Sequence, residues 1–170
     1  MTLNPFRLIW RADPARISLP DHTPVELAPL RSALPRTAFS RLTADGCRGH
    51  IDRDTVVLRY YRSLYRNDMN PVLEANLRTD STGTYLEGVY RMSQYGRVFM
   101  TGWFSFLLIL LPFFVLAGLN EVLGGNMEGL LFMVAPPGMI AFGIWFLRWG
   151  QSGWDVDKQR IETFITTHLR

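Results

Sequence analysis

Two long uncharged segments constrain this chain more than any other feature of its sequence. Val98–Leu119 contains 22 successive residues without a charge, and Gly129–Leu147 contains another 19. As helices they measure roughly 33 Å and 28 Å, close to the roughly 30 Å hydrocarbon core of a bilayer. A leader of 97 residues is too small to enclose two helices that are apolar on every face. We therefore predict two membrane spans, and we expect no cleaved signal peptide, because Met1–Arg16 lacks a secretory apolar core.

The basic residues near the spans predict their orientation. Five of them flank the two spans: Arg91 and Arg97 before the first, and Arg148, Lys158 and Arg160 after the second. The loop at 120–128 contains two acidic residues and neither lysine nor arginine. Because Lys and Arg close to a span tend to remain in the cytoplasm, we expect both termini there and the loop outside.

Composition indicates a bacterial inner-membrane protein. The chain has 17 arginines and one lysine, a bias typical of GC-rich bacterial genes, and bacterial outer-membrane proteins span as barrels instead. Cys47 is the only cysteine, so no disulfide can form within the chain. The positive net charge of +3 is spread along the sequence without basic runs interleaved with aromatic residues. We therefore expect membrane lipid as a partner and no nucleic acid.

The first part of the leader is rich in proline. Six prolines between positions 5 and 35 exclude a long helix. Phe6–Arg11 is the best candidate strand in this part, and Val25–Leu34 is expected to form one or two helical turns. From Thr37 onward the pattern changes to short runs of alternating polar and apolar residues.

These runs predict two hairpins. Cys47–Ile51 and Thr55–Arg62 flank a tight turn, and Val72–Thr79 and Thr84–Met92 flank a second turn that contains Gly83. Each run has one apolar face and one charged face, as in an antiparallel sheet that is covered on one side. We predict an antiparallel β-meander of at least four strands, with Thr37–Leu42 as a candidate fifth. The arginines and tyrosines of the other face are expected to be solvated, with a ligand-binding or docking face as the alternative.

The tail has the pattern of an amphipathic helix. Ile161, Phe164, Ile165 and Leu169 recur on one helical face, and Ser152 or Asp155 can cap the start of the helix. Packing on the sheet and lying in the lipid headgroup region are the two alternatives. The predicted fold class is an α+β membrane protein with three parts: a cytoplasmic β-rich domain (1–97), a transmembrane helical hairpin (98–148, spans 98–119 and 129–147) and a cytoplasmic amphipathic helix (149–170).

The sequence offers no recognisable catalytic, cofactor or metal site. It contains no G-x-S-x-G, Walker A, G-x-G-x-x-G or H-E-x-x-H motif. Cys47 and His50 have the spacing of a metal-ligand pair, but in a strand they point to opposite faces. Structural zinc normally requires four ligands, and His22 and His168 are the only other imidazoles. We therefore expect no enzyme activity, cofactor or metal.

Three prolines interrupt the predicted spans. Pro112 lies in the first span, and Pro136 and Pro137 lie in the second. Because proline lacks the N–H that bonds four residues back, kinks are expected at these positions. The backbone carbonyl groups that lose a hydrogen bond there are accommodated by ordinary packing of kinked helices or, alternatively, bonded by a partner helix or a hydrated groove. Neither span contains an ionisable group, so transport would require a larger assembly.

Four segments in order resemble a group of uncharacterised bacterial two-span membrane proteins: Cys47–Ile51, Arg66–Leu73, Gly83–Leu86 and Arg97–Phe104. The resemblance covers residues 37 to 148, and Cys47 stands where the group has a phenylalanine. It implies a β-rich cytoplasmic domain before a helical hairpin, and it implies no activity.

The favoured function is that of a non-enzymatic accessory or interaction protein of the inner membrane. Its cytoplasmic domain would dock a protein partner, or a second copy of the chain, close to the bilayer. The candidate contacts to that partner or to the lipid are Arg66, Asn67, Asn70, Tyr95 and Arg97. The alternatives are an immunity protein that neutralises a bacterial toxin and a small subunit of a transporter or membrane enzyme complex.

Overall fold

The chain forms two compact units in a computed structural model that describes residues 4–19, 27–35, 45–62, 68–81 and 83–169. The helical unit comprises Met1–Trp10 and Gln94–Gly150, and the sheet unit comprises Arg11–Ser93 and Gln151–Arg170. These boundaries differ from the expected ones at 97 and 148 in two respects. The first ten residues belong with the long helices, and the tail belongs with the sheet.

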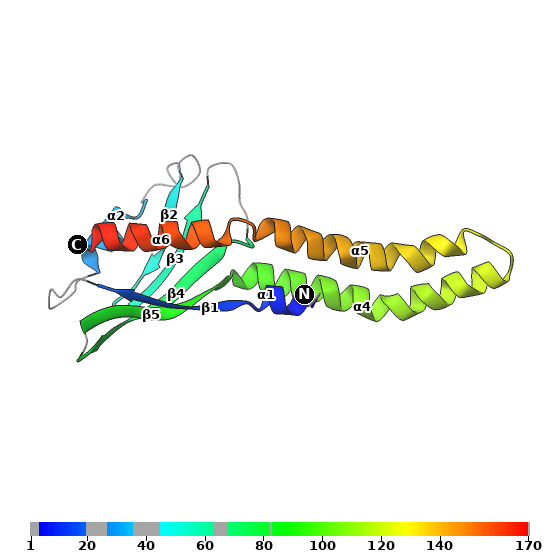
Figure 1. Cartoon of the computed structure of the whole chain (residues 1–170), viewed down its shortest axis with the longest axis horizontal. Coiled ribbons are helices and arrows are strands. Elements are labelled where there is room, and N and C mark those ends of the chain that lie inside the picture. The colour runs from blue at the N-terminus through cyan, green and yellow to red at the C-terminus, as the bar shows by residue number, and fades with distance from the viewer. Residues whose placement is uncertain (1–3, 20–26, 36–44, 63–67, 82, 170) are drawn as a thin grey trace. The chain divides into compact units, whose positions relative to one another are not determined.

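The sheet unit contains a five-stranded antiparallel sheet in the order β1-β5-β4-β3-β2 (Figure 1). Its strands are β1 (Ala12–Ser18), β2 (Gly46–Ile51), β3 (Thr55–Tyr61), β4 (Pro71–Asp80) and β5 (Gly83–Met92). Strands β2 to β5 form the predicted meander, since each pairs with the next along the chain. The fifth strand is β1, which pairs with β5 at one edge. The other candidate, Thr37–Leu42, lies outside the described residues.

The predicted strand at Phe6–Arg11 is wrong. Residues Pro5–Ile9 form the short helix α1, in which the Phe6 amide donates to Asn4 Oδ1 at 3.0 Å. An asparagine cap followed by proline at the first helical position favours a helix start, so local capping determines this segment. The strand begins only at Ala12 and contains Pro14, which is tolerated because β1 lies at the edge of the sheet.

The second short helix, α2 (Ala28–Ala33), lies within the predicted Val25–Leu34 segment. Leu30 is its fully buried residue. The helix therefore joins the core of the sheet unit with one side chain and leaves Arg31 and Ser32 exposed.

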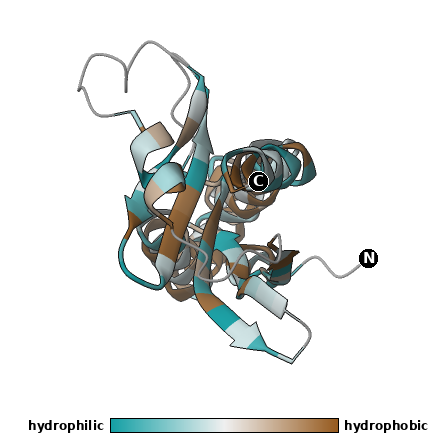
Figure 2. Cartoon of the chain, turned by 90° about the vertical axis from the view of Figure 1, so that its left-hand side faces the viewer, coloured by the Kyte–Doolittle hydropathy of each residue, from teal (hydrophilic) through white to brown (hydrophobic). Residues whose placement is uncertain are grey.

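One face of the sheet is buried beneath α6 (Trp154–His168), which crosses the strands in Figure 1. Apolar residues, brown in Figure 2, recur along the strands. The fully buried members of this core include Val56, Leu58, Leu73, Leu86, Tyr90, Met92, Trp154, Ile161 and Ile165. The tail helix therefore packs on the sheet, the first of the two alternatives. Its N-cap is Gly153, without a side-chain cap, rather than Ser152 or Asp155.

The helical unit is built from α4 (Gln94–Leu123) and α5 (Gly129–Gly150), which lie side by side in Figure 1. Glycine allows their backbones to approach closely, since a Cβ atom at Gly118 would meet the Gly129 carbonyl at 2.5 Å. A Cβ at Gly143 would lie 2.9 Å from the ring of Phe104. Small residues at such crossings are typical of helix pairs that associate in lipid.

Truncation of the α6 contact should destabilise the sheet unit. Ile161 is fully buried, so Ile161→Ala leaves a cavity and should cost about 2–4 kcal/mol of unfolding free energy. The matched control is Thr167→Ala on the exposed face of the same helix, which should change stability by less than about 0.5 kcal/mol. Urea unfolding of the detergent-solubilised chain measures both. Equal effects of the two substitutions would contradict the packing of α6 on the sheet.

Candidate functional site

The surface of the helical unit is strongly apolar. In the most hydrophobic windows of the two candidate spans, only 11% and 17% of the residues are buried within the structure. Large exposed side chains on this surface include Phe99, Ile109, Phe113, Leu116, Leu131, Val134 and Phe142. A continuous exposed apolar surface of this kind marks an interaction with a membrane or another protein. By length and composition, both helices can cross a bilayer.

The two ends of this helix pair differ in chemistry. The start of α4 carries Arg97, whose guanidinium lies 5.2 Å from the ring centroid of Trp10. The last turns of α5 carry Arg148 and the stacked rings of Trp145 and Trp149, whose centroids are 6.3 Å apart. The turn between the helices contains Glu121 and Glu128 instead. Arginine and tryptophan therefore gather at one end of the pair, as expected at a membrane–water interface.

The candidate contact residues fall into three groups. Arg66 and Asn67 lie outside the described residues. Asn70 directly precedes β4 and lies in a turn. The Ser93 hydroxyl stabilises this turn by donating a hydrogen bond to the Asp68 carbonyl at 2.9 Å. Tyr95 and Arg97 lie in the first turns of α4, and Tyr95 is 81% exposed. The structure therefore assigns Asn70 to the sheet unit and the other two to the helical unit.

The three span prolines lie inside α4 and α5, and both helices continue through them. Pro136 is buried, whereas Pro112 and Pro137 are exposed on the apolar surface. Pro136 thus belongs to the contact within the helical unit, and the other two lie on the surface available to lipid or a partner helix.

A polar cluster joins α6 to the strand β1. Asp13 accepts hydrogen bonds from Trp154 Nε1 at 3.0 Å, Lys158 Nζ at 3.3 Å and Arg11 Nε at 3.0 Å. Burial by itself raises the pKa of Asp13, but these three donors together hold it below its ordinary value. The cluster therefore keeps Asp13 ionised and fixes the start of α6 against the sheet edge.

A second ion pair lies on the side of α6 that faces the sheet. The Asp157 carboxylate has no exposed surface and accepts from Arg62 Nη2 at 2.9 Å through Oδ1. Its Oδ2 atom has no hydrogen-bond partner within the described part of the chain. Gly153 lies beside this pair, and a Cβ there would lie 2.7 Å from Arg62 Nη2, so the Arg62 side chain would have to shift. The helical pattern of the sequence did not identify Asp157, since an aspartate is normally assigned to the exposed face.

Cys47 lies in the same interface. Its side chain is 4% exposed, and its Sγ is 4.0 Å from the Arg160 carbonyl. Burial, with the negative charge of Asp157, raises the pKa of the thiol to about 12. A thiol that stays protonated at neutral pH is a poor nucleophile. His50 is exposed, so Cys47 and His50 do not converge, as expected from their strand spacing.

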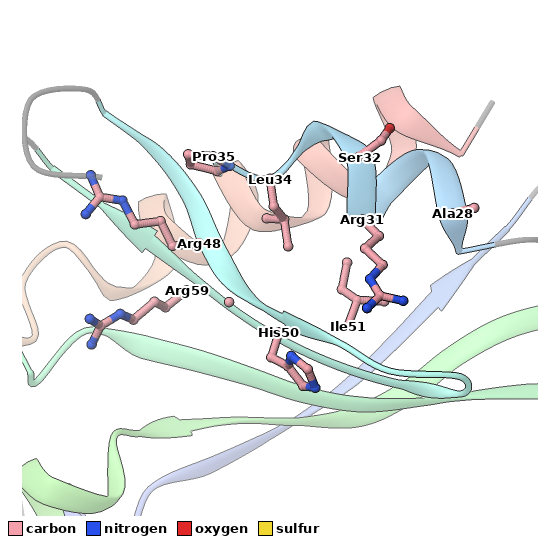
Figure 3. Close-up of a pocket in the computed structure, with 10 residues that line it drawn as sticks. Ala28, Arg31, Ser32, Leu34, Pro35, Arg48, His50, Ile51 and Arg59 are labelled. Atoms are coloured by element: carbon pink, nitrogen blue, oxygen red, sulfur yellow. The ribbon is translucent and has the colours of Figure 1, made fainter. Parts of the chain in front are cut away.

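A basic pocket lies between α2 and the edge strand β2 (Figure 3). Its volume is about 750 Å³, and it is lined from α2 and the following turn by Arg31, Ser32, Leu34 and Pro35, and from the sheet by Arg48, His50, Ile51 and Arg59. The sequence analysis did not single out these residues as a group. The signal was present, because a hairpin turn at residues 52–54 places Arg48 opposite Arg59.

No group of three or more His, Cys, Asp and Glu side chains able to hold a metal ion occurs among the residues described here. Comparisons with protein-family models, with curated proteins and with solved structures found no match to this chain. The candidate functional features are therefore the apolar surface of the helical unit and the basic pocket of the sheet unit.

The raised pKa of Cys47 should make the stability of the sheet unit fall at alkaline pH. Above pH 9 the unfolded chain ionises this thiol, whereas the folded chain keeps the proton until about pH 12, so the unfolded state is favoured progressively over that window. Cys47→Ala should therefore make the decline of unfolding free energy between pH 9 and 11 less steep. Urea unfolding at several pH values measures this slope.

The matched control is Val56→Ala, which also truncates a fully buried side chain but removes no ionisable group. It should lower stability equally at every pH. Some slope should remain in both variants above pH 10, because burial and the charge of Glu162 also raise the pKa of Tyr90. An unchanged slope in Cys47→Ala would contradict the assigned titration.

Proposed function

We propose that this chain is a non-enzymatic binding protein of the bacterial inner membrane, anchored by α4 and α5, with the sheet unit in the cytoplasm. The observation that carries this proposal is the exposed apolar surface of the helical unit, of which so little is buried within the chain. Exposure of such a surface to water is unfavourable, whereas a bilayer covers it and needs no further protein. The proposed architecture is that of the two-span group that the sequence resembles.

Charge supports the proposed orientation. Arg97 and Arg148 lie at the end of the helix pair that continues into the sheet unit, and Glu121 and Glu128 lie in the turn at the other end. Under the positive-inside rule, the arginine end faces the cytoplasm. Trp10, Trp145 and Trp149 at this end suit the headgroup region, where an indole ring is partly apolar and partly hydrated.

Short connections support docking close to the bilayer. Ser93 alone separates β5 from α4, and Gln151–Gly153 separate α5 from α6. Three extended residues reach at most about 11 Å. These short connections limit how far the sheet unit can lie from the proposed membrane anchor. The described candidate contacts are Asn70 on the sheet unit, and Tyr95 and Arg97 on the helical unit.

The chemistry of the buried groups supports binding rather than catalysis. Cys47, Asp157 and Tyr90 are reactive or titratable groups buried in the described part of the sheet unit, and each one takes part in a contact between α6 and the rest of that unit. Tyr90 donates its hydroxyl to Glu162 Oε1 at 3.2 Å, and Asp157 holds Arg62. These groups stabilise the position of the helix and are closed to a substrate.

Membrane topology is tested by labelling single cysteines in spheroplasts. Native Cys47 is buried and is unsuitable as a cytoplasmic marker, so the background is Cys47→Ala. Met127→Cys in the α4–α5 turn is preferred to a change at Gly125, whose φ of 87° favours glycine. Met127 is 70% exposed, and Arg53 in the β2–β3 turn is also exposed. We expect an impermeant thiol reagent to label Met127→Cys and not Arg53→Cys.

After permeabilisation both variants should label, which shows that each thiol is accessible. Labelling of Arg53→Cys alone in intact spheroplasts would reverse the proposed orientation. Extraction of the chain by alkaline carbonate, without detergent, would contradict the membrane anchor itself.

Docking is tested at Tyr95. Tyr95→Ala removes a large side chain that makes little contact within the chain, so folding and membrane insertion should be retained. We expect at least a tenfold loss of a cross-linked partner, or of a cross-linked second copy, when the chain is purified from cells. Tyr85→Ala, on the uncovered face of the sheet, is the matched control and should retain the complex. Equal recovery from both variants would contradict docking at the start of α4.

A further inference from the structure

The short helix α1 lies beside the first turns of α4, within the helical unit. Its Phe6 ring meets the Phe104 ring with centroids 6.4 Å apart, and its last turn leads to Trp10 beside Arg97. Phe104 lies six residues beyond Val98, where the uncharged run begins, which is roughly 9 Å along the helix axis. α1 therefore reaches from the level of Arg97 to a level within the apolar run.

The sides of α1 differ in exposure. Ile9 is fully buried, whereas Arg7 and Trp10 are exposed. Five residues offer too little apolar area to hold a helix in a membrane interface, so the contacts with α4 and α5 keep α1 in place. Interfacial helices place their apolar side chains about 5–10 Å below the headgroup boundary and keep basic residues above it. α1 has this arrangement at the level of Arg97.

Arg97 and Arg148 lie at the same end of the helix pair. The register of the two helices is set where Gly143 approaches the ring of Phe104. Arg97 precedes Phe104 by seven residues, and Arg148 follows Gly143 by five, so both lie roughly 8–11 Å beyond this crossing in the same direction. Arg7 lies in α1 beside the same turns of α4. Three elements therefore each bring an arginine to this end of the unit.

No carboxylate balances these arginines within the described part of the helical unit. Its acidic residues, Glu121 and Glu128, lie at the other end, and Glu121 is 24 residues from Arg97, or roughly 36 Å along α4. That distance is well beyond the screening length of about 8–10 Å. Neither Arg97 nor Arg148 forms a salt bridge with any residue that the structure describes. The positive charge of this end is therefore not neutralised within the unit.

Exposed apolar surface begins directly beside the same arginines. Val98 and Phe99 follow Arg97 in the chain and are 64% and 68% exposed, and Trp149, next to Arg148, is 52% exposed. A ligand that meets these arginines therefore meets apolar side chains as well. An amphiphile with an anionic head satisfies both, whereas an acidic protein segment would leave the apolar surface uncovered.

We infer that α1 and the arginine end of the helix pair bind the headgroups of anionic phospholipids in preference to zwitterionic ones. This inference deepens the proposed membrane anchor and rests on it. The choline of phosphatidylcholine cancels the charge of its phosphate, whereas phosphatidylglycerol keeps a net negative charge. Guanidinium groups donate paired hydrogen bonds to phosphate oxygens. Basic residues near a membrane surface attract anionic lipids cumulatively, so the three arginines need not converge on one headgroup.

The preference is measured by electron paramagnetic resonance of spin-labelled lipids. The full chain is reconstituted in phosphatidylcholine vesicles, and the association of spin-labelled phosphatidylglycerol is compared with that of spin-labelled phosphatidylcholine. We expect the association constant to be about threefold higher or more for phosphatidylglycerol. The ratio should fall at about 1 M salt, which screens exposed charges.

Single variants assign the preference to the arginines. Arg148→Gln removes an exposed charge without an ion pair, so folding should be retained and the ratio should fall by about half. Arg97→Gln should lower the ratio similarly, and Arg97→Lys, which keeps the charge, should restore most of it. The matched control is Arg53→Gln, which removes an exposed arginine from the β2–β3 turn of the sheet unit and should leave the ratio unchanged.

A ratio of one for the unmodified chain would overturn this inference in favour of an acidic protein segment as the ligand. Equal losses in Arg148→Gln and Arg53→Gln would overturn it as well, because the preference would then reflect overall charge. The membrane anchor is judged separately. A chain that alkaline carbonate removes from the vesicles contradicts the anchor and with it this inference, whereas a firmly inserted chain with a ratio of one contradicts the lipid preference alone.

Discussion

Burial of one face of the sheet beneath α6 is the contact on which the rest of this structure depends. The strands place Val56, Leu58, Leu73 and Leu86 on a common apolar face that needs a cover. The cover comes from the end of the chain, after α4 and α5 have both been completed. The chain must therefore return through α5 before the sheet unit can close its core. Residues on both sides of the helix pair consequently share one core, and unfolding of α6 exposes the sheet.

Polar groups inside this contact specify where α6 lies. Apolar packing is tolerant of small shifts, whereas Asp157 must meet Arg62 and Asp13 must meet Trp154 and Lys158. A buried ion pair is weak evidence for added stability, because desolvation opposes the attraction, but it penalises every arrangement that leaves one partner alone. Burial in this contact, with the negative charge of Asp157, raises the pKa of the neighbouring Cys47 thiol and keeps it protonated. The contact between α6 and the sheet therefore both positions the helix and keeps the buried thiol unreactive.

The two candidate functional features lie in different units and rest on different physics. The helical unit presents apolar surface that lipid can cover, and the sheet unit presents arginines that gather around a pocket. Lipid can cover the apolar surface without a particular protein partner. On the rest of the sheet face, arginines and carboxylates balance each other, which supports the interpretation of that area as a solvated face.

The sequence by itself determined the elements whose patterns are local. Long uncharged runs identified α4 and α5, alternation identified β2 to β5, and the apolar stripe identified α6. Tertiary structure alone decided the pairing of β1 with β5. Pro14 by itself argues against a strand, and it is tolerated here only because β1 lies at the edge of the sheet, where its missing N–H is not needed. It also decided that Asp157 is buried and that Arg31, Arg48 and Arg59 share a pocket. Periodicity reports which face a residue occupies on its own element, whereas the partner of a charge depends on how distant elements pack together.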